Sequence, residues 1–154
     1  LAYHELLNNG GCMVDSNRDV NEVCAIMLAG EKNGCVILGG GSPKNFYLQG
    51  QPTLWELYGI PKGGIDFFVQ LTTDQAVWGG LSGATPAEAV SWGKVNPGQL
   101  PDSVVAYCDS TIAFPLMCEY VVGSKEGRRS LKRLWHRRDE LVSELKRQAA
   151  AART

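Results

Sequence analysis

Short apolar runs alternate with amphipathic segments along most of the chain. The run at residues 35–38 is apolar throughout and is followed by three glycines, which predicts a parallel strand buried on both faces and followed by a tight turn. The apolar runs at 67–71 and 104–107 predict two more strands, each leading through a loop into a helix. Because strand, loop and helix recur three times, the sequence predicts an α/β protein with a parallel sheet and flanking helices.

Local signals place the helices. An Asp–Glu capping-box pair and an apolar stripe predict a helix over residues 19–28. Thr85 as N-cap and Pro86 at the first helical position predict a short helix that ends near Gly93. Further helices are expected in the opening segment and at residues 44–49 and 111–122.

The last segment has a pattern of its own. Residues 130–152 place leucines on one helix face and mostly charged residues on the other, which predicts a long amphipathic helix. We divide the chain into an α/β part, residues 1–124, and a basic C-terminal helix, residues 125–154. Docking of this helix on the α/β part is the expectation, and a nucleic-acid-binding arm is the alternative, which interspersed acidic residues disfavour.

Composition and charge narrow the class. A chain of 154 residues with 44% hydrophobic and 20% charged residues suits one globular domain. The sequence contains no long apolar run and no signal-peptide pattern, so we expect a cytoplasmic protein without membrane association. Residues 1–124 hold five Lys/Arg against twelve Asp/Glu, whereas residues from 125 onward hold ten against four. An acidic body suits a small cationic substrate.

The cysteines favour a reducing compartment. Five cysteines without CxxC spacing predict neither a zinc ribbon nor a disulfide framework. Cys24, Cys35, Cys108 and Cys118 stand in apolar surroundings, so we expect them to be buried and unreactive.

The candidate ligand-binding and catalytic residues follow the predicted strands or lie on and just after one short helix. Ligands of parallel sheets collect at the carboxyl ends of the strands. The tightest grouping of an acid, an aromatic ring and an amine is Glu88, Trp92 and Lys94. An indole beside an amine disfavours its charged form, and an uncharged lysine is a nucleophile toward carbonyl or imine carbon. Capping by Glu88, packing by Trp92 and a helix-dipole contact for Lys94 are the structural alternatives.

Residues 87–94, AEAVSWGK, resemble the active-site segment of deoxyhypusine synthases. Residues 35–44 resemble the strand, triple-glycine turn and following lysine of that family, and residues 72–83 resemble its cofactor loop. Residues 107–116 are similar to its strand, acidic turn and Phe-Pro-Leu helix. The resemblance runs from residue 19 to about 122, corresponds to the C-terminal half of the family, and is most like its prokaryotic deoxyhypusine-synthase-like branch.

The resemblance implies a Rossmann-like fold, usually tetrameric, and an NAD-dependent transferase of alkyl groups. In the family, NAD accepts a hydride from spermidine, and the aminobutyl fragment is held as an imine on the active-site lysine, here Lys94. The fragment then passes to a lysine of a translation factor and is reduced, which is the first step of hypusine biosynthesis. Transfer to a free diamine such as putrescine, giving homospermidine, is the alternative.

The same resemblance implies roles for other residues. A carboxylate and an indole suit a flexible cation, so Glu88 and Trp92 would contact the polyamine. The other substrate-binding positions implied are Asn45, Gln49, Gly79, Gly80 and Leu81. The positions expected to line the NAD site are Gly40, Gly41, Thr73, Asp74, Asp109 and Ser110.

The chain also departs from the family pattern. Asn45 stands where the family commonly has a histidine, and Trp78 and Leu81 replace acidic residues. These departures leave open a non-catalytic subunit that assembles with an active partner. Because the resemblance covers half of the family, we expect a second chain, or the remainder of a longer enzyme, to supply the half that completes the NAD site.

Overall fold

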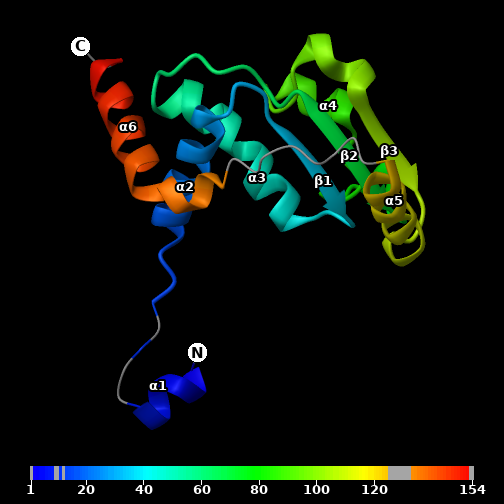
Figure 1. The fold of residues 1–154 in the computed structure, drawn as a ribbon, viewed down its shortest axis with the longest axis horizontal. Helices are drawn as coiled ribbons and strands as arrows, with labels where there is room; N and C mark the ends of the chain where they lie inside the picture. The colour runs from blue at the N-terminus through cyan, green and yellow to red at the C-terminus, as the bar shows by residue number, and fades with distance from the viewer. Residues whose placement is uncertain (1, 9–10, 12, 125–132, 153–154) are drawn as a thin grey trace.

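The computed structural model describes residues 2–8, 11, 13–124 and 133–152. Its sheet contains the strands β1 (Gly34–Leu38), β2 (Phe67–Thr72) and β3 (Ser103–Tyr107), which are parallel and adjacent in that order (Figure 1). The predicted α/β class and parallel sheet are confirmed.

Six α-helices accompany the sheet within the described ranges. They are α1 (Ala2–Asn8), α2 (Ser16–Ala29), α3 (Ser42–Pro52), α4 (Pro86–Ser91), α5 (Ser110–Ser124) and α6 (Arg138–Ala151). The shorter turns are the π-helical η1 (Thr53–Leu57) and the 3-10 turns η2 (Ala76–Trp78), η3 (Pro97–Asp102) and η4 (Leu134–Arg137). The helices predicted in the opening segment and near residues 44–49, 86–93 and 111–122 are confirmed, and η1 is an addition.

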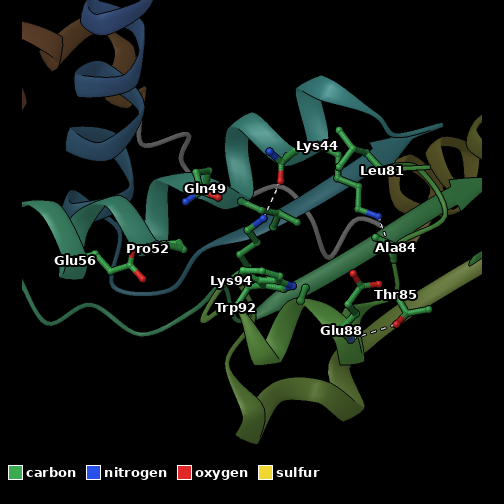
Figure 2. Close-up of a pocket in the computed structure, with 13 residues that line it drawn as sticks. Lys44, Gln49, Pro52, Glu56, Leu81, Ala84, Thr85, Glu88, Trp92 and Lys94 are labelled. Atoms are coloured by element: carbon green, nitrogen blue, oxygen red, sulfur yellow. Dashed lines mark hydrogen bonds between the residues drawn. The ribbon is translucent and has the colours of Figure 1, made fainter. Parts of the chain in front are cut away.

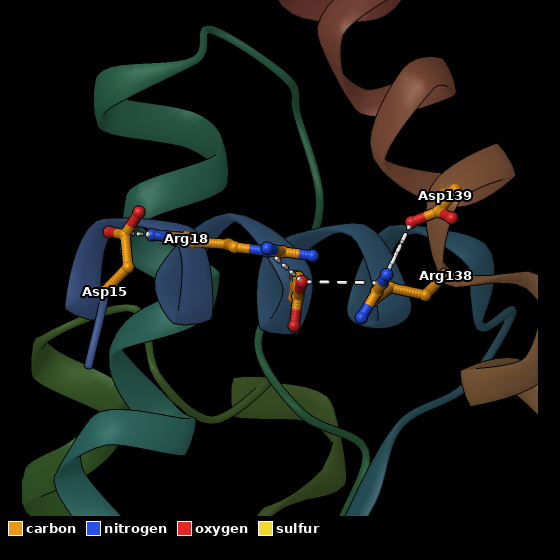
Figure 3. A network of polar contacts seen from close by, with 5 residues as sticks. Asp15, Arg18, Arg138 and Asp139 are labelled. Atoms are coloured by element: carbon orange, nitrogen blue, oxygen red, sulfur yellow. Dashed lines mark hydrogen bonds and ion pairs between the residues drawn. The ribbon is translucent and has the colours of Figure 1, made fainter. Parts of the chain in front are cut away.

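Helix α2 begins earlier than its sequence signal predicts. Asp15 is the N-cap, and its Oδ1 accepts a hydrogen bond from the backbone N–H of Arg18 at 3.0 Å. Glu22 is nearly buried, and its Oε1 lies 2.9 Å from Nε of Arg18 and 3.5 Å from Nε of Arg138 on α6 (Figure 3). The predicted capping box of Asp19 and Glu22 is therefore wrong, because Glu22 links α2 to α6.

The C-terminal helix docks on α2, as expected. Leu141 and Leu145 of α6 are 7% and 4% exposed and belong to the main core. The helix begins at Arg138, because Arg133 has a left-handed backbone (φ 44°) and a 3-10 turn follows it. The predicted start at residues 130–132 lies outside the described residues.

The core lies on one face of the sheet. Helices α3 and α4 belong to successive crossovers between parallel strands, and crossovers of the same hand place them on the same side. The buried apolar residues of this core are Cys24, Ala25, Met27, Leu48, Leu54, Ile60, Ile65, Phe68, Ala89, Val95, Leu141 and Leu145.

Within the described residues, much of the opposite face of the sheet is exposed, although Leu71 on that face is 3% exposed. The parallel register aligns Val36, Val69 and Val104 on that face, and Val36 and Val104 are 55% and 53% exposed. The prediction that residues 35–38 are buried on both faces is therefore wrong. Helix α5, all of which is described, contains no buried residue and leaves Leu116 exposed.

The cysteines differ in their surroundings. Burial raises the pKa of Cys24 and of Cys35 to about 11. Cys118 is exposed on the uncovered helix α5, and Cys35 and Cys108 are half-buried, so the expectation of four buried thiols is confirmed only for Cys24. In the described part of the chain, no helix has the length and apolar character needed to cross a membrane.

Candidate functional site

A cavity of about 380 Å³ opens between α3, η1 and α4 (Figure 2). It is lined by Lys44, Asn45, Leu48, Gln49, Pro52, Glu56, Leu81, Ala84, Thr85, Glu88, Ala89, Trp92 and Lys94. The lining thus combines two lysines, two carboxylates, two amides and a central apolar surface.

The two ends of α4 fix the backbone on one side of this cavity. At the start, Oγ1 of Thr85 accepts a hydrogen bond from the N–H of Glu88 at 3.2 Å, which confirms the predicted N-cap. At the end, Gly93 has φ 67° and donates to the carbonyl of Val90, while Lys94 N–H donates to the carbonyl of Ala89, both at 3.0 Å. This pair of bonds is a Schellman motif. The position of Lys94 therefore follows from the way α4 ends.

The side chain of Lys94 turns into the cavity. Its Nζ donates to Oδ1 of Asn45 on α3 at 2.7 Å and lies 5.9 Å from the ring centroid of Trp92 (Figure 2). Trp92 is 63% exposed, so the ring removes little water from the amine, and its face attracts a cation.

A buried polar network lies behind the cavity. Lys44 is 6% exposed, and its Nζ donates to Oε1 of Gln70 at 3.0 Å and to the carbonyl of Ala84 at 2.6 Å. Nε2 of Gln70 donates to the carbonyls of Gly39 and Ser82 at 2.8 and 2.7 Å. Gln70 thereby joins the turn after β1, the loop after β2 and helix α3.

Burial also changes the acidity of Lys44. Desolvation lowers the pKa of Lys44, nearby acidic groups (Cys35, Glu88 and Asp74) oppose that change, and the charge of Lys94 adds a smaller lowering. The amine of Lys44 is bound by two internal acceptors, whereas the amine of Lys94 faces the open cavity. The sequence analysis did not include Gln70 among the site residues. A polar glutamine within an otherwise apolar strand was the sequence feature that could have indicated it.

Most of the implied substrate residues meet at the cavity. Those that line it, besides Lys94, are Asn45, Gln49, Leu81, Glu88 and Trp92. Gly79 and Gly80 are not part of its lining, since they follow η2, where Gly79 is a left-handed C-cap with φ 71°. Glu56 lines the cavity and was not expected, because its position depends on η1.

The implied NAD positions lie at the carboxyl ends of the three strands, and none of them is part of the lining of the cavity. Gly40 and Gly41 follow β1, Thr73 and Asp74 follow β2, and the last two, Asp109 and Ser110, follow β3.

Two of these positions fit a dinucleotide. A Cβ at Gly41 would meet no atom within 4 Å, so the backbone is open to close approach by a phosphate. Oδ1 of Asp109 accepts bonds from Thr111 N and Oγ1 at 2.8 and 2.7 Å, which lowers the pKa of Asp109 and keeps an anion available for ribose hydroxyls. Gly40 is a glycine for a different reason, since its Cβ would lie 2.6 Å from Cα of Ser82.

The fold and the cavity define an α/β protein with a lysine-bearing site at the carboxyl side of a parallel sheet. A family model for deoxyhypusine synthase matches residues 1–121. The chain belongs to the deoxyhypusine synthase family.

Curated relatives agree with this assignment. A deoxyhypusine synthase-like protein of Nostoc punctiforme is 48% identical over 152 residues, which cover 96% of this chain and 39% of the relative. A deoxyhypusine synthase-like protein of Nostoc sp. is 51% identical over 151 residues, with the same coverage. A probable deoxyhypusine synthase 1 of Archaeoglobus fulgidus is 39% identical over 119 residues, 77% of this chain and 36% of that protein. The chain thus spans about two-fifths of the length of the relatives it matches.

Proposed function

We propose that this chain supplies the lysine-bearing part of an NAD-dependent transferase, which moves the aminobutyl group of spermidine to an acceptor amine through an imine on Lys94. The observation that carries the proposal is the placement of the Lys94 amine in a cavity that also presents a carboxylate, an indole and an amide. A translation-factor lysine is the acceptor we propose. Transfer to putrescine is the alternative within the same chemistry.

Each cavity residue has a physical task in this proposal. Asn45 holds the amine of Lys94 at the cavity wall through its 2.7 Å hydrogen bond. Glu88 pairs with an ammonium group of the polyamine, and Trp92 attracts a cation to its ring face. After losing a proton, Lys94 adds to the oxidised carbon of the polyamine, and the remainder of the polyamine leaves as an amine.

The NAD site is only partly built from this chain. Bound NAD would accept the hydride from the polyamine and return it to the product. The open backbone at Gly41 and the carboxylate of Asp109 would hold its phosphate and ribose. The remaining contacts would come from outside the described residues.

We propose that polypeptide corresponding to the rest of the family's length covers the open sheet face. Val36, Leu38, Phe67 and Val104 on that face are 44–55% exposed, and the exposed side chains of α5 extend the apolar surface. Exposed apolar patches of this kind mark interfaces. The relatives contain substantial sequence beyond the matched 39%, so a complementary half fits this surface.

Co-expression tests the partner. The chain is produced with the part of the Nostoc punctiforme relative that lies outside its match, and we expect an equimolar complex, or a higher oligomer built from it. Val104→Lys should abolish it, whereas Val14→Lys, which alters an exposed valine ahead of α2, should leave it intact. A chain that binds no such partner, or one in which both variants behave alike, contradicts the proposed interface.

Borohydride trapping tests the chemistry. The complex is incubated with NAD and spermidine labelled in the aminobutyl group and is then reduced. We expect protein-bound label that is lost in Lys94→Arg, since a guanidinium does not form this imine, and retained in Lys146→Arg. Full transferase activity in Lys94→Ala would instead identify a non-catalytic subunit.

A further inference from the structure

We infer that Glu56 is a second cation anchor of the cavity, in addition to Glu88, for the polyamine of the proposed reaction. This inference rests on the proposed function and assigns a further substrate-binding residue to the same site. It assigns the role to a residue of η1, a segment that the resemblance did not associate with the substrate.

The π-helical turn places Glu56 on the cavity wall. The N–H of Tyr58 donates to the carbonyl of Thr53 at 3.2 Å, which closes the wide turn. Thr53 and Leu54 are 7% and 0% exposed and anchor the turn in the core. A π turn contains one extra residue and rotates the residues after it by about 100° relative to a continuous α-helix. Glu56 lies within this turn, where it is exposed and part of the lining.

Contact with the end of α4 fixes this turn relative to Lys94. A Cβ added to Gly93 would lie 3.2 Å from Nε1 of Trp55, so the Trp55 ring packs on the residue that precedes Lys94. Trp55 and Glu56 are neighbours on η1. The residues next to Glu56 and Lys94 in the chain are therefore in contact with each other.

The two carboxylates of the cavity come from different elements of the fold. Glu56 comes from η1 and Glu88 from α4, and in Figure 2 Trp92 and Lys94 lie between them. Within the described residues, neither carboxylate makes a hydrogen bond or ion pair through its side chain. Leu48, Pro52 and Leu81 are among the apolar residues of the lining. Because the Glu56 side chain makes no such bond within the described residues, it is available to pair with one ammonium group of a polyamine while Glu88 pairs with another.

Paired ligands test the inference directly. The full chain is titrated with 1,4-diaminobutane and with n-butylamine, which differ in one ammonium group, and the indole N–H signals are followed by NMR. We expect the diamine to bind more tightly and to shift the signals of Trp55 and Trp92. An accessible ion pair contributes up to about 1 kcal/mol, so Glu56→Gln should weaken diamine binding roughly two- to fivefold and leave butylamine unchanged.

Matched variants separate a local anchor from general electrostatics. Glu56→Asp keeps the charge and should retain most of the diamine preference, and Glu31→Gln removes an exposed carboxylate outside the cavity and should have no effect. The inference is overturned if Glu56→Gln leaves the diamine preference intact, if Glu31→Gln has the same effect, or if the diamine shifts neither indole signal. If label is trapped on Lys94 but Glu56→Gln binds the diamine as tightly as the unchanged chain, the transferase proposal holds and the inference about Glu56 is refuted.

Discussion

Replacing Gln70 by methionine removes the central member of the network behind the cavity at nearly constant volume. Gln70 is fully buried in β2 and makes three hydrogen bonds, one to Lys44 and two to the carbonyls of Gly39 and Ser82. Methionine is similar in length and leaves little cavity. The loss of stability should therefore come from the hydrogen-bond partners of Gln70, which lose their bonds in the variant.

The magnitude follows from those groups. Lys44 keeps its bond to the carbonyl of Ala84 but loses an acceptor while remaining 6% exposed, which costs about 1–3 kcal/mol for a buried polar group. The carbonyls of Gly39 and Ser82 belong to half-buried residues and can regain water, so each adds about 0.5 kcal/mol. We expect the free energy of unfolding to fall by about 2–4 kcal/mol.

Urea unfolding followed by tryptophan fluorescence measures this change. The expected result is a lower midpoint with an unchanged slope. Gln75→Met is the matched control, because Gln75 is exposed and surface substitutions typically change stability by less than about 0.5 kcal/mol. Equal midpoints for the two variants would refute the structural role of the network.

Three further predictions concern the backbone, the thiols and a buried charge. Gly64→Ala should destabilise the fold by more than about 1 kcal/mol, because its Cβ would lie 2.3 Å from a backbone carbon, whereas Gly63→Ala has 3.9 Å of room and should be nearly neutral in the same urea assay. Iodoacetamide at neutral pH should label the exposed Cys118 first and should label Cys24 only after the protein unfolds, because burial raises the pKa of Cys24 to about 11. Peptide mass spectrometry identifies the labelled cysteines, and equal labelling rates for the two would contradict this prediction. Desolvation lowers the pKa of Lys44, so between that lowered pKa and 10.5 the unfolded chain binds more protons than the folded chain. The contribution of Lys44 to the free energy of unfolding therefore rises with pH across that window. Lys44→Met should remove this rise, and parallel curves of stability against pH for the two proteins would contradict the prediction.

The elements that could be predicted from the sequence are those with local signals. The three strands are mainly apolar runs, with Gln70 as an exception in β2. Thr85 and Pro86 mark the start of α4 through local capping signals. The grouping of Glu88, Trp92 and Lys94 was also accessible, because it depends on one short helix and its end.

Features that depend on tertiary contacts were not predictable in this way. Glu56 reaches the cavity through a π turn anchored by buried neighbours, and an isolated helix pattern carries no signal for it. The local pattern assigns Glu22 to a cap because α6, its partner through Arg138, is distant in sequence. The exposure of Val36 could not be predicted either. An apolar strand has the same sequence pattern whether its second face is covered by this chain or by another polypeptide.

The central claim is that Lys94, and not its buried neighbour Lys44, carries the aminobutyl fragment. Peptide mass spectrometry of the borohydride-reduced complex distinguishes them, because the two lysines lie on α3 and after α4, in different peptides. We predict a reduced aminobutyl adduct on the peptide that contains Lys94, dependent on both NAD and spermidine. An adduct on Lys44, or an unmodified Lys94 in a complex that turns over spermidine, would contradict the account.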